Sequence, residues 1–296
     1  MFKKISYVIL IVIALPVFAY LVAVYLNNRE VAYPTKDQMQ QQLERSVQWL
    51  VDNENVILQQ GNPMLWWMLY EAEKRSGDAR LAELLNKYFL KYSRIKDSGW
   101  GPLFGAAPHN YLPAYSVDGL PYYNKHFIYS LNCAKSIADD LLIVEQQNQP
   151  GFCHQLNYIY RPACATHQLM GINFLSVQNC GLLPDIKQVT ESLQGDIRLQ
   201  LMLDVRLVDV YLQRVLMLLI TGAVDEVKPV WLQQVLDHQL EDGGWGDFVS
   251  LIDLSPDRSV GFSSRILSLG KEKSSYHATP QGVLILTYLL YLETKS

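Results

Sequence analysis

Clusters of basic residues are absent from this sequence of 296 residues. Only 18% of the residues are charged, lysine and arginine never occur in runs longer than two, and the formal net charge is −4. A protein that binds nucleic acid through its phosphates needs a concentrated basic surface. The composition therefore argues against a nucleic-acid partner.

Charge is also missing from one long segment near the N-terminus, Ile5–Leu26. A helix over this segment would cross a hydrocarbon core of roughly 30 Å at about 1.5 Å per residue. The apolar region of a cleaved signal peptide is shorter, about 7–15 residues. The pattern predicts a tip at 1–4, a transmembrane anchor at 5–26, a linker at 27–36 and a folded domain at 37–296.

Basic residues near the ends of this segment predict its orientation. Lys3 and Lys4 precede it together with the amino terminus, whereas Arg29 and Lys36 follow it. The side richer in basic residues normally stays in the cytoplasm. We therefore expect a single-pass protein of the inner (plasma) membrane, with a cytoplasmic N-terminus and a periplasmic, or extracytoplasmic, main domain.

Cysteine is scarce, and all four cysteines lie in one window of the chain. An even number in an extracytoplasmic domain suggests two disulfides, with Cys133, Cys153, Cys164 and Cys180 as candidates. Buried free thiols are a second interpretation. The third is zinc, bound by Cys153, His154, Cys164 and His167, although the spacing matches no common zinc motif. We predict no cofactor and retain zinc as the weaker alternative.

Runs with strand-type alternation are lacking as well. Apolar residues instead recur at spacings of three and four, as in Met39, Leu43 and Val47, which is typical of amphipathic helices. Mixed helices alternate with more apolar ones along the domain. The sequence therefore predicts an all-α domain of about five helical hairpins.

Three segments depart from this regular pattern. Segments 96–121 and 243–275 contain no clear helix, and loops of that length in a compact domain tend to be functional. The stretch Leu199–Ile220 is strongly apolar but contains charges that are too costly for lipid. We expect it to form one central helix of the core.

A glycine–tryptophan motif occurs twice, as "HQLEDGGWGDF" (238–248) and more weakly as "KDSGWGPLFG" (96–105). Together with the later "YHATPQGVLILTYLL", it resembles repeats of the α/α-toroid superfamily. That superfamily includes squalene–hopene and other class II terpenoid cyclases and the β subunits of protein prenyltransferases. The resemblance implies a ring of outer and inner helices. The expected fold is thus a transmembrane helix followed by an incomplete α/α toroid.

The motif itself is expected to be structural. Its glycines permit a sharp exit from a helix, an aspartate can cap the next turn, and the tryptophan can pack between hairpins. The residues in this expected role are Trp100, Asp242, Gly243, Gly244 and Trp245.

The catalytic motifs of the superfamily are missing. The cyclases use Asp-x-Asp-Asp, but the nearest text, "SIADDLL", has Ile137 in place of the first acid and leaves only Asp139 and Asp140. No Asp-x-Cys motif of the zinc prenyltransferases occurs. The resemblance therefore transfers no catalytic residue to this chain.

Candidate site residues come instead from the predicted starts of inner helices, which converge at one mouth of a toroid. The ligand-binding candidates are Trp66, Trp67, Tyr122, Tyr123, His126 and Tyr276. The catalytic candidates are Asp204, Asp209, His167 and His277. The alternative for the two aspartates is structural pairing with Arg206 and Arg214.

Two functions remain open at this point. One is a membrane-anchored extracytoplasmic domain that binds a ligand or partner in the cell envelope without chemistry. The other is an envelope enzyme that acts on an isoprenoid, lipid-linked or glycan substrate. An open cavity that contains a carboxylate close to a histidine would favour the enzyme. An interior filled by Trp66, Trp67, Met170 and Met202 would favour the binding domain.

Overall fold

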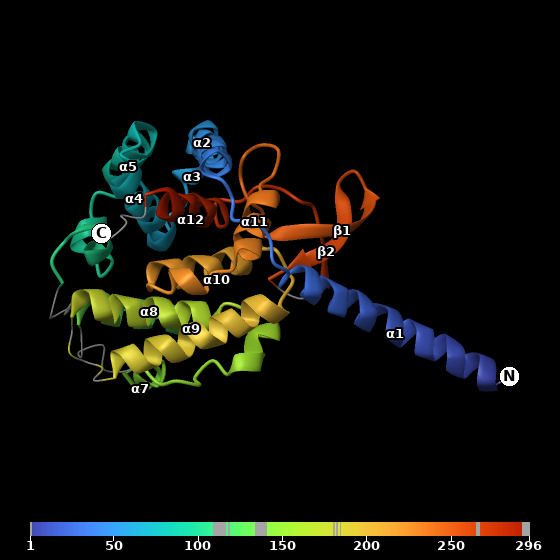
Figure 1. The fold of residues 1–296 in the computed structure, drawn as a ribbon. Helices are drawn as coiled ribbons and strands as arrows, with labels where there is room; N and C mark the ends of the chain where they lie inside the picture. Colours follow the sequence, from blue (N-terminus) through green and yellow to red (C-terminus); the bar gives the residue numbers. More distant parts are fainter. Residues whose placement is uncertain are drawn as a thin grey trace.

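The computed structural model describes residues 2–108, 117, 119–133, 141–179, 181, 183, 185–264 and 267–291. Helices dominate this part of the chain (Figure 1). The helices are α1 (Phe2–Leu26), α2 (Lys36–Asp52), α3 (Glu54–Ile57), α4 (Pro63–Ser76), α5 (Ala79–Lys91), α6 (Tyr122–Asn132), α7 (Leu141–Gln146), α8 (Cys164–Gln178), α9 (Ile186–Leu203), α10 (Asp209–Ile220), α11 (Pro229–Asp237) and α12 (Thr279–Leu290). The strands are β1 (Phe248–Ser255), β2 (Arg258–Ser263) and β3 (Leu267–Gly270).

Helix α12 lies at the centre of the helical body. It packs against α2, α4 and α10, while α8 packs between α6 and α9 (Figure 1). Every residue of α12 from Thr279 to Thr287 is buried, as the apolar sequence requires. The last helix in the sequence thus connects the N-terminal helices to the middle of the chain.

Helix α4 begins with a capped first turn at Asn62 and Pro63. The Asn62 side chain accepts a hydrogen bond from the backbone N–H of Met64, and Pro63 is the first helical residue. The helix ends before Gly77, which has a φ of 65°. This conformation favours glycine because it has no Cβ.

The prediction of an all-α domain is wrong, because part of segment 243–275 forms a sheet. Strands β1, β2 and β3 form an antiparallel sheet in that order, with Phe248 opposite Ser263 and Phe262 opposite Leu267. The register of β1 shifts between Ser250 and Ile252 and again between Asp253 and Ser255. Each irregularity interrupts the alternation of apolar and polar residues, so the period-two signal is lost from the sequence.

The predicted transmembrane anchor is also wrong. Among the described residues, no helix is long and apolar enough to cross a membrane. The same finding contradicts the predicted single-pass location in the inner membrane, from which the periplasmic placement of the domain was inferred.

The end of α1 is instead fastened to the folded body. The Tyr20 hydroxyl donates to the carbonyl of Leu203 at 3.0 Å, and the Asn27 amide donates to the carbonyl of Leu201 at 2.6 Å. The Trp231 indole N–H donates to the Asn27 carbonyl at 3.0 Å. These attachments join the end of α1 to α9 and α11, while most of the large apolar side chains between Leu15 and Leu26 remain exposed.

The expected central helix over Leu199–Ile220 is interrupted. Helix α9 ends at Leu203 and α10 begins at Asp209. In the break, Asp204 accepts two hydrogen bonds from Arg206, at 2.7 and 2.6 Å, and one from Arg214 at 2.8 Å. Residues two apart do not face each other on a helix, so the Asp204–Arg206 pair requires the break.

This buried ion cluster holds three parts of the chain together. All three of its side chains are at most 7% exposed. Arg214 also donates to the carbonyl of Pro162 and Arg206 to the carbonyl of Ser264, both at 3.2 Å. Burial opposes the ionisation of Asp204, but the two guanidinium groups together hold its pKa below the usual value. The cluster thus fixes segments far apart in sequence.

We expect Asp204→Asn to lower the free energy of unfolding by about 3–5 kcal/mol, because two buried arginines lose their counter-charge. Urea denaturation would measure the change. The matched control is Asp257→Asn, whose carboxylate pairs with Lys271 at the exposed surface, where solvent screens the pair, and this substitution should change stability far less. Equal effects of the two substitutions would contradict the assignment.

The Asp242–Trp245 motif connects α2, α11 and α12. Asp242 accepts hydrogen bonds from the Trp49 indole at 3.0 Å and from the Ser274 hydroxyl at 2.5 Å. Gly243 has a φ of 97°, and a Cβ there would lie 2.5 Å from the Arg45 carbonyl oxygen. The indole of Trp245 is 1% exposed and donates to the Val235 carbonyl at 2.7 Å. The motif therefore closes the contact between these helices.

Truncation of the Trp245 side chain tests that role. Trp245→Ala should reduce the free energy of unfolding by about 3–5 kcal/mol, because it leaves a cavity at a fully buried position. Trp245→Phe should cost less because it keeps most of the packing and loses the indole hydrogen bond. A melting temperature of Trp245→Ala equal to that of the wild type would refute the role.

Candidate functional site

A cavity of about 590 Å³ lies where the starts of several helices converge. Its wall is built from α4, α6, α8 and α10, from the turn before α12 and from α12 itself. The lining residues include Asn62, Met64, Leu65, Met68, Trp100, Tyr122, Tyr123, Phe127, Arg161, Cys164, Thr166, His167, Met170, Asp209, Gln213, Leu216, Met217, His277 and Gln281. This volume is within the range of pockets that bind small organic ligands.

A carboxylate and an imidazole are paired on the cavity wall. Asp209 is the first residue of α10, and its Oδ2 lies 3.1 Å from Nδ1 of His277, in the turn that leads into α12. The Asp209 side chain is 11% exposed, whereas that of His277 is 40% exposed. The carboxylate is therefore held inside the wall and the imidazole remains accessible.

The hydrogen bond with Asp209 sets the protonation of His277. This hydrogen bond, which outweighs the opposing effect of burial, raises the pKa of His277 above its usual value. When Nδ1–H donates to the carboxylate, Nε2 of the neutral ring becomes the basic nitrogen. The pair therefore has the geometry of an oriented proton acceptor.

A second histidine, His167, lies on the same wall at the start of α8. Its ring stacks on the Tyr123 ring, with centroids 4.2 Å apart, and meets the edge of Phe127. Burial, aided by the charge of His277, lowers the pKa of His167 to about 4. His167 is thus a neutral imidazole at neutral pH, and the two histidines have opposite pKa shifts.

Amide side chains one helical turn from the pair complete its surroundings. Gln213 follows Asp209 on α10 and accepts a hydrogen bond from the Thr166 hydroxyl at 3.1 Å. Gln281 donates to the carbonyl of His277 at 2.8 Å. Neither residue was predicted from the sequence, although Gln213 lies four residues after Asp209 on one face of α10 and Gln281 follows His277 by the same spacing at the start of α12.

The structure brings together five of the predicted site residues: Tyr122, Tyr123, His167, Asp209 and His277. The remaining ones lie elsewhere. Trp66 is buried against Tyr88, and Trp67 against Phe174, in the hydrophobic core. Asp204 belongs to the buried ion cluster, and Tyr276 is outside the cavity lining.

The two glycine–tryptophan motifs have different surroundings. Trp245 is fully buried, whereas Trp100 is only partly buried and faces the cavity. A Cβ on Gly101 would collide with the Lys96 carbonyl oxygen, so this glycine is required for the turn that presents Trp100. The weaker copy of the motif thus contributes directly to the site.

Cys153 and Cys164 form a disulfide with their Cα atoms 5.5 Å apart, and Cys133 is also disulfide-bonded. This pairing leaves neither Cys153 nor Cys164 as a thiolate for zinc beside His154 or His167. In the described ranges, no three histidine, cysteine or acidic side chains are grouped to hold a metal ion. Cys180, Ile137, Asp139 and Asp140 lie outside these ranges.

Comparisons with protein-family models, with curated proteins and with solved structures find no match for the chain.

His126 is a buried histidine outside the cavity. Its Nε2 lies 2.8 Å from Oδ1 of Asn148, and its ring packs so closely against Gly171 that a Cβ there would collide. Burial, only partly offset by the hydrogen bond with Asn148, lowers its pKa to about 4. The close approach of α6 to α8 therefore requires glycine at position 171, and it buries a His126 that is neutral at neutral pH.

We expect the free energy of unfolding to fall as the pH falls from about 6.5 to 4. In this window the unfolded chain binds a proton at His126 and the folded chain does not, which is worth roughly 3 kcal/mol at about 1.4 kcal/mol per pKa unit. Urea denaturation of wild type and His126→Gln at pH 7 and 4.5 would measure the difference. The variant should lose less stability between these pH values; an unchanged loss would contradict the assignment.

Proposed function

We propose that the protein is an enzyme that binds a small molecule in this cavity, with the Asp209–His277 pair as its proton acceptor. The observation that carries the proposal is a carboxylate 3.1 Å from an accessible imidazole on the wall of a 590 Å³ cavity. General-base catalysis needs such an oriented imidazole with its free nitrogen directed at substrate or water. The alternative, binding without chemistry, gives no particular role to the pair.

The chemistry of the lining narrows the reaction class. Asp209 is the sole acidic side chain among the described lining residues. Glycoside hydrolysis normally uses two carboxylates on opposite sides of the scissile bond. Hydrolysis by water that His277 activates, or removal of a proton from the substrate, fits the residues better.

His167 supplies the second polar group. The pKa of His167 is about 4, whereas that of His277 is raised above the usual value, so His167 is already neutral where His277 loses its proton. A neutral imidazole can donate a hydrogen bond to an oxygen on which negative charge develops. In this proposal His277 takes the proton and His167 binds the oxygen.

Hydrolysis of 4-nitrophenyl acetate offers a direct test. His277→Gln should lower kcat/KM by about 10²–10⁴-fold, because the general base is lost. His238→Gln is the matched control, since His238 lies at the end of α11 and outside the cavity lining. The same comparison would be made with a panel of amides and a panel of aldols as substrates. Equal rates for wild type and His277→Gln on the ester and on both panels would refute the enzyme and indicate a cavity that binds without chemistry.

The pH dependence tests the role of Asp209 separately. The wild-type rate should rise with pH as His277 loses its proton. In Asp209→Asn the pKa of His277 is no longer raised, so this rise should move to lower pH while the plateau rate falls. The same change in pKa should be visible in the ring-proton NMR signals of His277 without any substrate. An identical His277 titration in Asp209→Asn would contradict the assignment.

A further inference from the structure

The polarity of the cavity changes along its length. On α10 the lining begins with Asp209 and Gln213 and continues with Leu216 and Met217, and at 1.5 Å per residue the helix advances about 12 Å from Asp209 to Met217. On α8, Thr166 and His167 are followed one turn later by Met170. The starts of α8 and α10 therefore form a polar end, and the later turns of these two helices form an apolar end.

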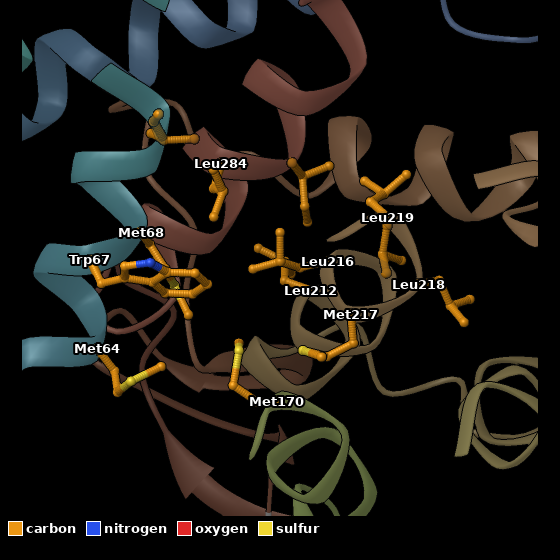
Figure 2. Packing of buried hydrophobic residues seen from close by; sticks show 14 of the residues in the cluster. Met64, Trp67, Met68, Met170, Leu212, Leu216, Met217, Leu218, Leu219 and Leu284 are labelled. Carbon is orange, nitrogen blue, oxygen red and sulfur yellow. The ribbon is translucent and has the colours of Figure 1, made fainter. Parts of the chain in front are cut away.

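Methionine dominates the apolar end. Four of the seven methionines in the chain line this cavity: Met64, Met68, Met170 and Met217. In Figure 2, Met64 and Met68 extend from α4, while Met170 and Met217 lie on the opposite side beside Leu216. Methionine is unbranched, flexible and polarizable, so such a wall adapts to an apolar group of irregular or changing shape.

This arrangement disfavours a compact, uniformly polar ligand. Hydroxyl groups placed against the methionines would lose water without gaining hydrogen bonds. A wholly apolar ligand would likewise displace water from His277 and His167 without offering their ring nitrogens a hydrogen bond. The ligand that satisfies both ends is elongated, with one polar end and one apolar end.

We propose that the substrate bound in this cavity is a small amphiphile. Its flexible, unbranched apolar chain contacts the four methionines, and its polar group lies at His277. The identity of the reacting end rests on the proposed function. The binding of the chain depends only on the apolar wall, so binding and turnover can fail independently.

The homologous 1-alkanols from butanol to decanol test the binding of the chain. Calorimetric titration of the wild-type protein should give a Kd that falls about fourfold for each added CH₂, which corresponds to about 0.8 kcal/mol, until the apolar end is filled. His277→Gln should retain this dependence, since it alters only the polar end. A Kd that does not change from butanol to decanol would overturn the proposal.

Substitutions in the methionine wall locate the site. Met170→Gln and Met64→Gln should reduce the affinity for decanol at least tenfold and the affinity for butanol much less. Met170→Leu and Met64→Leu are the matched controls and should stay within about threefold of wild type, because they conserve volume and polarity. Melting temperatures identify any variant that fails to fold. If the glutamine variant at one of the two positions does not fold, the variant at the other position tests the proposal.

Exposed apolar residues of the sheet provide a competing binding surface. Ile252 is 63% exposed on β1, so Ile252→Ser should leave decanol binding unchanged. Loss of binding in Ile252→Ser, with no loss in the folded glutamine variants, would place the alkanol on the sheet and overturn the proposal.

The outcomes separate this proposal from the proposed function. If turnover depends on His277 but the affinity for alkanols does not change with chain length, the proposed enzymatic function stands and the proposed amphiphilic substrate is refuted. Chain-dependent binding without any turnover that depends on His277 would refute the enzyme, and the amphiphile would then be a ligand rather than a substrate.

Discussion

The salt-bridged contact of Asp204 with Arg206 and Arg214 is the interaction on which the arrangement of the cavity depends. It lies in the break between α9 and α10, and the two arginines extend it to the carbonyls of Pro162 and Ser264. Pro162 directly precedes the α8 segment that carries His167, and Arg214 belongs to the helix that begins with Asp209. One carboxylate therefore fixes the relative positions of segments that supply both a candidate base and its neighbour.

A buried cluster of this kind is expensive unless every charge is paired, because each ion loses its hydration. Here Asp204 faces two guanidinium groups whose remaining donors reach backbone carbonyls and Gln200. The break that allows this also begins α10 anew at Asp209. Had the two helices been continuous, Asp209 would lie within a helix rather than at its first turn. The break between α9 and α10 thus allows the ion cluster to form and also places Asp209 at the start of a helix.

Much of the site could be predicted from helix starts. Polar residues at the beginning of an apolar helix, such as Asp209 or His167, have to face something other than core, and the starts of neighbouring helices meet. Trp66, Trp67 and His126 satisfied the same sequence criteria but face the core. A single helix start does not indicate which of its side chains points to a cavity, since that depends on how the helix is rotated against its neighbours.

The amino-acid sequence by itself determined the helical periodicity, the cap at Asn62 and the positive φ at Gly243, because each depends on residues close together in the chain. Tertiary structure alone decided the rest. The sheet contains register shifts, the end of α1 is attached to residues beyond 200, and the Asp209–His277 pair joins residues 68 positions apart. Contacts between distant residues depend on the packing of whole elements, which no local pattern encodes.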